Sequence, residues 1–362
     1  MAECIRRVAI STGGGDAPGL NAVIRAVART GFGYGWDIFG IPDGFDGLLG
    51  KGRVERLDQR DIRGILPQGG TILGTTNRGN PFHYPVEENG QVVYHDLSDR
   101  VLTRAAELRL DALVVIGGDG TLRIARDLAR KGLRVVGVPK TIDNDLSATD
   151  VTFGFETAVN TATDAIDKLH TTAESHHRAM VLEVMGRDAG WIALASGIAG
   201  GADVILIPEI PFDIERVCRK VEDRDRRGRK FSIIVVAEGA KPAGGQSVGT
   251  RLPDGSLRLG GIGQQVADQV AAGTNNEVRL TVLGHLQRGG APTPGDRLLA
   301  SRYGVAAAHL VARGGFGRMV ALRTPNIISV PLDEAVGHTR TVPLDSDLVL
   351  TARSLGIELG AE

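Results

Sequence analysis

DALVVIGGDGTLRIARDLARKGLRVVGVPKTIDND, residues 111–145, is the stretch of sequence that decides the fold. Its apolar runs 113–116 and 135–138 predict two buried strands, and the segment between them predicts a helix. The glycine turn GGDGT follows the first strand, and a loop with two aspartates follows the second. Parallel strands joined by right-handed crossovers end at one edge of their sheet, so we expect Asp119, Asp143 and Asp145 to converge on one crevice. Carboxylates beside a glycine-rich turn indicate metal-assisted chemistry on phosphate.

The composition argues against several classes of protein. A chain of 362 residues, 42% of them hydrophobic, buries a sizeable core and predicts two domains. The net charge of −1 gives no general attraction for nucleic acid or acidic membranes. The two cysteines, Cys4 and Cys218, lack the spacing of metal ligands and argue against zinc or disulfide frameworks. MAECIRR leads directly into a strand without a signal pattern, and no apolar run approaches about 18 residues, so we expect a cytoplasmic protein.

A second glycine turn lies near the start of the chain. GGGD (13–16) follows the strand VAIST, and we expect it to present N–H groups at a helix N-terminus, where the helix dipole favours an anion such as a polyphosphate. Its spacing matches neither G-x-G-x-x-G nor G-x-x-x-x-G-K-[ST], so a plain turn is an equal alternative. Arg25 and Arg29 share one helix face, and Arg78 lies among small residues. Each of these arginines suits either a phosphate contact or a solvated surface.

The motif PKTIDND (139–145) is more unusual. In an extended loop, Asp143 and Asp145 point the same way, so that one can accept a hydroxyl proton while the other orients it. A helix N-cap with an Asx-turn is the structural alternative.

Polar residues also surround later strands of the chain. An arginine just past a strand's carboxyl end is well placed to clamp a phosphate by paired hydrogen bonds, whereas a methionine there is more often core. The glycine-rich segment 240–263 is either a flap or a plain loop. Beyond Ala312, we expect only Arg340 to reach a site. The residues concerned are Met185, Gly186 and Arg187 after strand 179–184, Glu238 after strand 231–237, and His285 and Arg288 after a strand that Arg279 precedes.

Several motifs occur in a fixed order: GGGDAPGLNAVIR (13–25), GGDGT (117–121), PKTIDND (139–145), HHR (176–178), MGR (185–187), IAGGAD (198–203), Glu238 and VLGHLQRGG (282–290). Together they resemble the 6-phosphofructokinase family from near Val8 to about Gly315. The resemblance implies an α/β fold with two interleaved three-layer domains, mostly parallel sheets and an active site in the cleft between them. It implies a donor-binding domain, residues 1–150 plus about 275–325, and a fructose-6-phosphate-binding domain, residues 151–274 plus about 326–362.

The resemblance also implies a role for each matching residue. Asp143 takes the proton from the sugar 1-hydroxyl, Asp145 supports it, Thr141 contacts the moving phosphoryl group, and Asp119 holds Mg²⁺. The family usually has an arginine near the donor phosphates, and Arg78 stands one residue after that position. The donor phosphates are bound by Gly14, Gly15, Arg78, Gly118, Gly120, Thr121 and Lys140; the sugar phosphate is bound by Met185, Gly186, Arg187, Glu238, His285 and Arg288, and Arg187 is also catalytic.

The phosphoryl donor and the assembly follow from the same resemblance. Pyrophosphate users of the family typically have an acidic residue at the position of Gly120 and a lysine at the position of Lys140. Gly120 therefore favours ATP, whereas Lys140 favours pyrophosphate. We expect ATP, with pyrophosphate as the alternative. Gly120 is stronger evidence than Lys140, because a carboxylate at position 120 would both clash with an α-phosphate and repel its negative charge. Arg178 and Arg279 are implied to reach the sugar phosphate from an adjoining subunit, which implies a homo-oligomer. Dimer or tetramer, the effector and reversibility stay open.

The sequence allows two other interpretations, of which only the second is not an enzyme. A lipid or NAD kinase shares GGDGT, but PKTIDND and GHLQRGG count against it. A catalytically silent regulatory subunit that binds a sugar phosphate is the other, and the presence of both Asp119 and Asp143 argues against it. Arg123 and Ile124 replace small residues that are common along the nucleotide-facing helix of the family.

Overall fold

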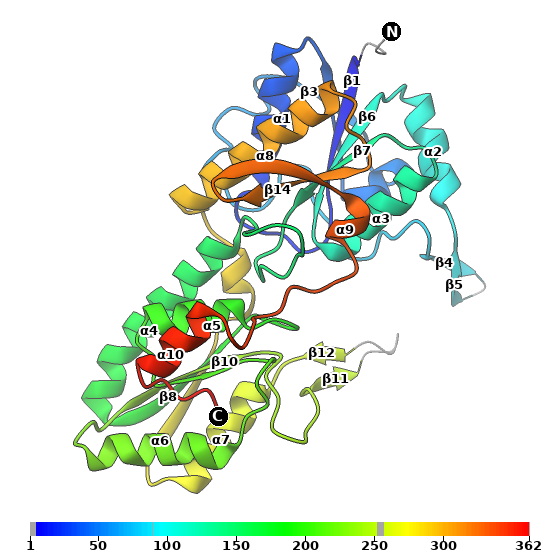
Figure 1. Cartoon of the computed structure of the whole chain (residues 1–362). Coiled ribbons are helices and arrows are strands. Elements are labelled where there is room, and N and C mark those ends of the chain that lie inside the picture. The colour runs from blue at the N-terminus through cyan, green and yellow to red at the C-terminus, as the bar shows by residue number, and fades with distance from the viewer. Residues whose placement is uncertain (1–4, 89, 252–256, 362) are drawn as a thin grey trace. The chain divides into compact units, whose positions relative to one another are not determined.

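The computed structural model describes residues 5–88, 90–251 and 257–361, and these residues form two compact units (Figure 1). Unit 1 comprises the described parts of Met1–Ile142, Leu146–Glu156 and Arg288–Thr339. Unit 2 comprises the described parts of Asp143–Asp145, Thr157–Gln287 and Arg340–Glu362. Each unit therefore contains segments that are far apart in the sequence.

The short segments 143–145 and 151–156 and two longer segments lie in a different unit from the one expected from the sequence. Residues 275–287 belong to unit 2, because β13 (Glu277–Val282) pairs with β8 (Arg178–Val184). Residues 326–339 belong to unit 1, because β15 (Asn326–Pro331) pairs with β14 (Arg318–Arg323). Pairing between strands decides both placements, and no local pattern in the sequence reveals it. The division of donor and sugar-phosphate binding between two domains stays a prediction.

Unit 1 contains a seven-stranded sheet in the order β15-β14-β7-β6-β1-β2-β3. The pairs from β14 to β2 are parallel, and β15 and β3 close the edges with antiparallel pairs. This arrangement confirms the expected α/β fold with a mostly parallel sheet. The other strands of the sheet are β1 (Arg7–Thr12), β2 (Asp37–Ile41), β3 (Glu55–Leu57), β6 (Ala112–Gly117) and β7 (Val135–Pro139).

Helices cover both faces of this sheet (Figure 1). α1 (Leu20–Gly33) and α8 (Pro294–Ala312) pack side by side over the face that Val114 and Ile116 enter. α3 (Asp119–Arg130) packs over the other face, which Leu113 and Val115 enter. Successive residues of a strand point to opposite faces, so the wholly apolar β6 contributes to both cores. Unit 1 also contains η1 (Gly44–Leu49), β4 (Tyr84–Glu88), β5 (Gln91–His95), α2 (Ser98–Glu107) and α9 (Leu332–Ala335).

Unit 2 contains a four-stranded parallel sheet in the order β13-β8-β10-β9. The glycine-rich segment 240–263 includes the short hairpin β11–β12, and residues 252–256 of this segment lie outside the described residues. None of the helices in the described ranges is long and apolar enough to cross a membrane. The other elements are α4 (Phe155–His176), which begins in unit 1, α5 (Trp191–Ala199), β9 (Val204–Leu206), α6 (Ile214–Arg226), β10 (Ser232–Ala237), β11 (Gly249–Arg251), β12 (Leu257–Leu259), α7 (Ile262–Gly273), η2 (Gly284–Arg288), whose last residue belongs to unit 1, and α10 (Asp347–Ser354).

Tyr303 of α8 provides a test of the unit 1 core. Its side chain is fully buried, its hydroxyl donates to the Val151 carbonyl oxygen at 2.6 Å, and burial raises the pKa of Tyr303 to about 12. A tyrosine in the unfolded chain has a pKa of about 10, so the unfolded state loses this proton first and stability falls as the pH rises from about 10 towards about 12. We expect Tyr303→Phe to remove about 1 kcal/mol of the stability lost between about pH 8 and about pH 11, measured by urea unfolding. An equal loss in both proteins would contradict the burial of this hydroxyl.

Candidate active site

The first glycine turn, residues 13–16, is held by backbone hydrogen bonds of unit 1. Gly13 and Gly14 donate their N–H groups to carbonyl oxygens of neighbouring segments at 2.9 and 3.1 Å. Helix α1 begins only at Leu20, after a turn that contains Pro18. The expectation that the glycine turn lies at a helix N-terminus is therefore wrong, because the proline turn separates the two.

Thr121 brings the second glycine turn against the first. Its buried side chain occupies the space that a Cβ atom on Gly13 or Gly117 would need, with contacts of 2.7 and 2.4 Å. Only a residue without a Cβ permits such a close approach. The ends of β1 and β6 therefore meet in unit 1, as their parallel order predicts.

The N-terminus of α3 carries the rest of GGDGT. Gly118 is the N-cap residue and Asp119 is the first helical residue. Apart from its two chain neighbours and the backbone of α3 itself, a Cβ atom added to Gly120 would have no protein atom within 4 Å. Because N–H groups and the helix dipole favour an anion at such a terminus, the second glycine turn, not the first, provides the helix-terminal anion site.

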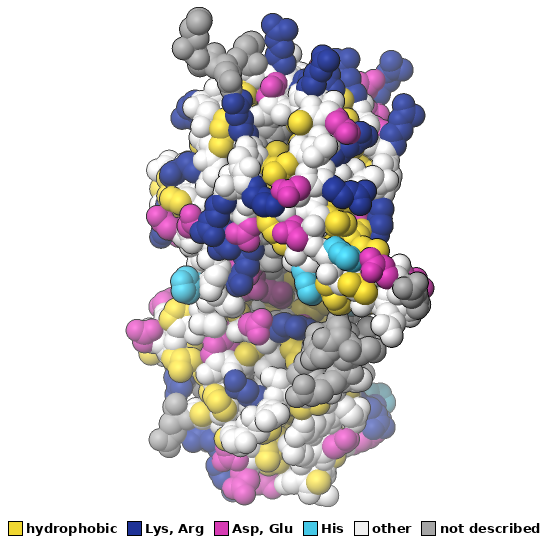
Figure 2. Space-filling model, turned by 90° about the vertical axis from the view of Figure 1, so that its right-hand side faces the viewer, with side chains coloured by type: hydrophobic (Ala, Val, Ile, Leu, Met, Phe, Trp, Pro, Cys, Tyr) yellow, Lys and Arg dark blue, Asp and Glu magenta, His cyan; other side chains and the backbone are white. Residues whose placement is uncertain are grey.

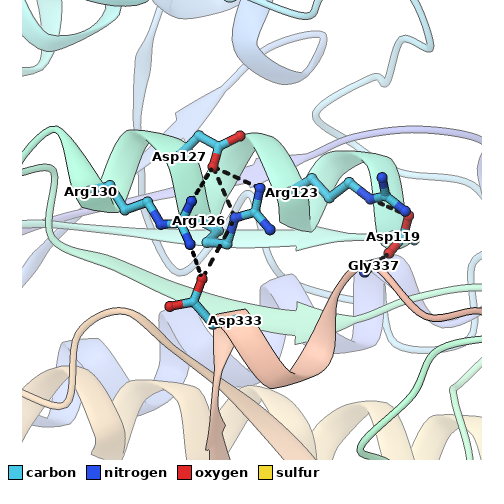
Figure 3. A network of polar contacts seen from close by, with 7 residues as sticks. All are labelled: Asp119, Arg123, Arg126, Asp127, Arg130, Asp333 and Gly337. Carbon is cyan, nitrogen blue, oxygen red and sulfur yellow. Dashed lines mark hydrogen bonds and ion pairs between the residues drawn. The ribbon is translucent and has the colours of Figure 1, made fainter.

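Asp119 has two partners within unit 1 (Figure 3). Its Oδ2 lies 2.7 Å from Nε of Arg123, and its Oδ1 accepts the N–H of Gly337 at 3.0 Å. The i,i+4 spacing of Asp119 and Arg123 was a signal for the first contact, whereas no local signal predicts Gly337. Figure 3 also shows the ion pairs farther along α3, among Arg126, Asp127, Arg130 and Asp333 of α9.

Two cationic side chains bind carbonyl oxygens of the first glycine turn. Lys140 is buried, and its ammonium group donates to the carbonyl oxygen of Gly15. Arg288 donates from Nη1 to the carbonyl oxygen of Asp16 at 3.2 Å, and a Cβ atom on Gly15 would lie 2.6 Å from this nitrogen. Arg288, expected at the sugar phosphate, therefore lies beside the first glycine turn of unit 1.

Arg78 and Thr141 are the remaining residues of unit 1 expected at the donor. Arg78 is exposed, and its N–H donates to Thr76 Oγ1 at 3.1 Å. The carbonyl oxygen of Thr76 in turn accepts the N–H of Gly14, so this loop brings Arg78 near the first glycine turn. Thr141 follows Lys140, and its carbonyl oxygen accepts the hydroxyl of Thr152 at 2.8 Å.

The loop Asp143–Asp145 belongs to unit 2 and turns sharply. Asn144 has a φ of 53°, in the left-handed region, and it is 3% exposed. The expected extended loop is therefore wrong, and the i,i+2 rule for strands does not describe these two aspartates. The carbonyl oxygen of Asp145 accepts the N–H of Arg340 at 2.8 Å. Because Asp119 belongs to unit 1, the convergence of the three aspartates stays a prediction.

Two groups of expected site residues, 185–187 and Glu238, meet at the carboxyl ends of β8 and β10 in unit 2. The two strands pair in parallel register, so residues 185–187 and Glu238 lie side by side. Gly239 donates its N–H to the carbonyl oxygen of Gly186 at 3.0 Å. Met185 and Gly186 are buried, whereas Arg187 is exposed and accessible to a ligand.

Gln287 is a member of this cluster that sequence reasoning missed. It is fully buried, and its Oε1 accepts the N–H of Met185 at 2.7 Å. It lies in η2 after β13, with the exposed His285 on the same turn. Its place between His285 and Arg288 in the motif GHLQRGG was the available signal.

Arg178 and Arg279 lie in the N-terminal halves of β8 and β13, whereas residues 185–187 follow the carboxyl end of β8. Arg178 is the first residue of β8, and Met185 follows its last residue, so they are separated by roughly 23 Å at about 3.3 Å per residue. Both arginines pair with Glu277, Arg178 through Nε at 2.7 Å, and the hydrogen bond from Arg178 lowers the pKa of Glu277. Arg279 lies opposite Met180, five residues before Met185 or about 16 Å by the same rise, so within one chain neither arginine joins residues 185–187 at a single site.

A separate pocket of unit 1 contains the other arginines considered from the sequence. Arg25 and Arg29 line it with Arg63 and Gln59. Three guanidinium groups at one pocket favour an anion site over a merely solvated face. Elsewhere the charges are mixed, since Figure 2 shows Lys and Arg side chains interspersed with Asp and Glu over the visible face.

A match to a known protein family covers most of the chain. The model described as phosphofructokinase matches residues 7–311. The chain belongs to the phosphofructokinase family. The match confirms the resemblance drawn from the motifs, and it includes both glycine turns, the Asp143–Asp145 loop and the strand-end cluster of unit 2.

Phosphofructokinase relatives at similar identity differ in the donor that their names give. The ATP-dependent 6-phosphofructokinase of Chloroflexus aurantiacus is 58% identical over 362 residues, 100% of each chain. The pyrophosphate–fructose 6-phosphate 1-phosphotransferase of Amycolatopsis methanolica is 54% identical over 344 residues, 93% of this chain and 96% of the relative. The solved structure of Pichia pastoris phosphofructokinase in the T-state is 31% identical, with a TM-score of 0.80, and the match covers 99% of this chain and 37% of that one.

The contact between the two strand ends of unit 2 is testable through Gly239. A Cβ atom at this position would lie 1.8 Å from the carbonyl oxygen of Arg187, so the backbone must shift to accept it. We expect Gly239→Ala to lower the free energy of unfolding by about 1–3 kcal/mol, measured by urea unfolding. Gly33→Ala is the matched control, because a Cβ atom there meets nothing within 4 Å. Equal stability of both variants would contradict this backbone contact.

Proposed function

We propose that this chain transfers the γ-phosphoryl group of ATP to the 1-hydroxyl of fructose 6-phosphate, as a cytoplasmic homo-oligomer. The observation that carries the proposal is its identity of 58%, over its full length, to an enzyme named ATP-dependent 6-phosphofructokinase. The geometry of each unit supports it. Unit 1 offers two glycine turns and buried or partly buried cations, which suit a polyphosphate. Unit 2 offers an acidic loop and an exposed strand-end arginine, which suit a phosphorylated sugar.

Asp119 is the proposed Mg²⁺ ligand. Proteins usually bind Mg²⁺ through one or two carboxylates together with substrate phosphates. Asp119 fits this pattern as a single carboxylate at the N-terminus of α3, where a bound phosphate would supply further oxygen ligands. Each carboxylate oxygen has two lone pairs, so the contacts of Oδ1 with Gly337 and of Oδ2 with Arg123 leave lone pairs of Asp119 for a metal. When bound, Mg²⁺ neutralises charge on the donor phosphates.

The proposed transfer depends mainly on positioning and charge. A sugar hydroxyl is a weak nucleophile, and phosphoryl transfer is accelerated by alignment and by stabilisation of the charge on the moving group. Asp143 accepts the hydroxyl proton as the oxygen attacks, with Asp145 supporting it, and Thr141 contacts the moving group. The donor phosphates are held by Gly14, Gly15, Arg78, Gly118, Gly120, Thr121 and Lys140, and the sugar phosphate by Met185, Gly186, Arg187, Glu238, His285 and Arg288.

The homo-oligomer is proposed from the position of two arginines. Arg178 and Arg279 are implied by the family resemblance to bind the sugar phosphate, yet they lie away from residues 185–187 of their own chain. A second copy of the chain is the source of these two guanidinium groups on our proposal.

ATP is favoured over pyrophosphate by two local features. On our proposal, the α-phosphate that pyrophosphate lacks lies beside Gly120, where a Cβ atom would meet no other segment of the protein within 4 Å. The ammonium group of Lys140, the feature typical of pyrophosphate users, is bound to the carbonyl oxygen of Gly15 and so supports the glycine turn itself. Pyrophosphate is the second candidate donor, because a relative with that name is 54% identical.

Substitution of Gly120 tests the choice of donor. A carboxylate there would repel an α-phosphate, and like-charge contacts cost several kcal/mol, so we expect Gly120→Asp to lower kcat/KM for ATP by about 10²-fold or more relative to pyrophosphate. Gly120→Ala, which adds volume without charge, is the control and should have a smaller effect. Steady-state rates with both donors measure this preference. Undiminished use of ATP by Gly120→Asp would contradict the assignment.

Substitution of Asp143 tests the proposed base. General-base catalysis contributes about 10²–10⁴-fold, so we expect Asp143→Ser to lower kcat by that factor. The KM for fructose 6-phosphate should stay nearly constant, since other residues bind the sugar phosphate. Asp164→Ser, at an exposed aspartate of α4 in the same unit, is the matched control. Unchanged kcat in Asp143→Ser would remove Asp143 from this role.

A further inference from the structure

Residues 340–342 bind the loop that carries the proposed base. The N–H of Arg340 donates to the carbonyl oxygen of Asp145 at 2.8 Å. The carbonyl oxygen of Arg340 accepts Nε1–H of Trp191 at 2.9 Å, and its guanidinium group lies 4.6 Å from the centre of a Trp191 ring. One peptide segment therefore joins the acidic loop to the first residue of α5, all within unit 2.

Glu209 fixes the same segment at its other end. Its Oε1 accepts the N–H of Val342 at 2.7 Å, and both carboxylate oxygens accept the N–H of Gly190 at 3.0 and 3.1 Å. Gly190 is the N-cap residue of α5, where the helix dipole favours a negative charge. Trp191 and Glu209 thus hold residues 340–342 against the start of one helix.

The Asp143–Asp145 loop needs such external support. Asn144 occupies the left-handed region and is almost completely buried. A non-glycine residue in this region costs free energy, and it persists only where surrounding contacts fix the backbone. The hydrogen bond from Arg340 reaches the carbonyl group of Asp145, the residue directly after Asn144, where it constrains the direction of the loop.

We propose that Trp191 and Glu209 are positioning residues for Asp143, acting through the backbone of Arg340 and Asp145. This inference rests on the proposed function of Asp143 as the base. A small displacement of a reacting group is enough to slow a reaction strongly, and the loop has no strand or helix of its own to hold it. The two residues lie outside every motif that carried the family resemblance.

Trp191→Phe removes the indole N–H and keeps an aromatic ring beneath the Arg340 guanidinium group. We expect kcat to fall about tenfold, and the KM for fructose 6-phosphate and for ATP to stay within about twofold, because the loop positions the base and other residues bind the substrates. Trp36→Phe is the matched control, since Trp36 is the other tryptophan, is also buried and belongs to unit 1. A rise in KM with unchanged kcat would overturn the proposal.

A double-mutant cycle separates positioning from general damage. If Trp191 acts only through Asp143, Trp191→Phe should not lower kcat further in the Asp143→Ser background. The same loss of kcat in both backgrounds would overturn the positioning role while leaving Asp143 as the base. Unchanged kcat in Asp143→Ser alone would instead refute the proposed base, and the positioning role with it.

Glu209→Gln gives the same test if Trp191→Phe does not fold. The amide keeps one acceptor oxygen for the three N–H contacts of Glu209, so kcat should fall and the fall should again vanish in the Asp143→Ser background. Asp111→Asn is the matched control, because Asp111 also accepts two backbone N–H groups but lies in unit 1. A fall of equal size in both backgrounds would again overturn the proposal.

Discussion

The packing of Thr121 against Gly13 and Gly117 is the constraint on which the two glycine turns of unit 1 depend. β1 and β6 are parallel neighbours, so their carboxyl ends meet at one edge of the sheet. The threonine side chain fills the space that two missing Cβ atoms leave, and α3 can then begin directly beside the first glycine turn. Larger residues at either glycine would push these backbones apart, and Lys140 could no longer reach Gly15.

Three cations beside the glycine turns of unit 1 are held in place by oxygen atoms of the protein itself. Lys140 and Arg288 each bind a backbone carbonyl oxygen of the first glycine turn, and Arg123 binds the carboxylate of Asp119. Charged groups that are already oriented require little reorganisation when an anion arrives, which is the main source of electrostatic stabilisation in enzymes. The same contacts stiffen the turn, because each cation bonds to one of its backbone atoms or to the start of α3.

The sequence predicted contacts that follow from local pattern, and it failed where distant segments or special backbone conformations decide. The apolar runs of β6 and β7 and the polar residues after β8 and β10 are where they were expected, since strand order and alternation are local properties. The first glycine turn was wrongly placed at a helix because Pro18 delays α1, and the acidic loop was wrongly drawn as extended because Asn144 adopts a positive φ. The partners of Asp119 and Asp145 among residues 337–340 come from the far end of the chain, and no periodicity announces them.

In this family, enzymes named for different phosphoryl donors occur at similar overall identity to this chain. Relatives at 58% and 54% identity carry names with different donors, although both align with nearly the whole chain. ATP and pyrophosphate each present two linked phosphates that the same turns could hold, and ATP adds an α-phosphate and a nucleoside. On our proposal, the added part passes the N-terminus of α3, where Gly120 contributes neither volume nor charge. One carboxylate at that point would change the free energy of ATP binding by several kcal/mol without disturbing the core, so a single residue can separate enzymes that share a fold.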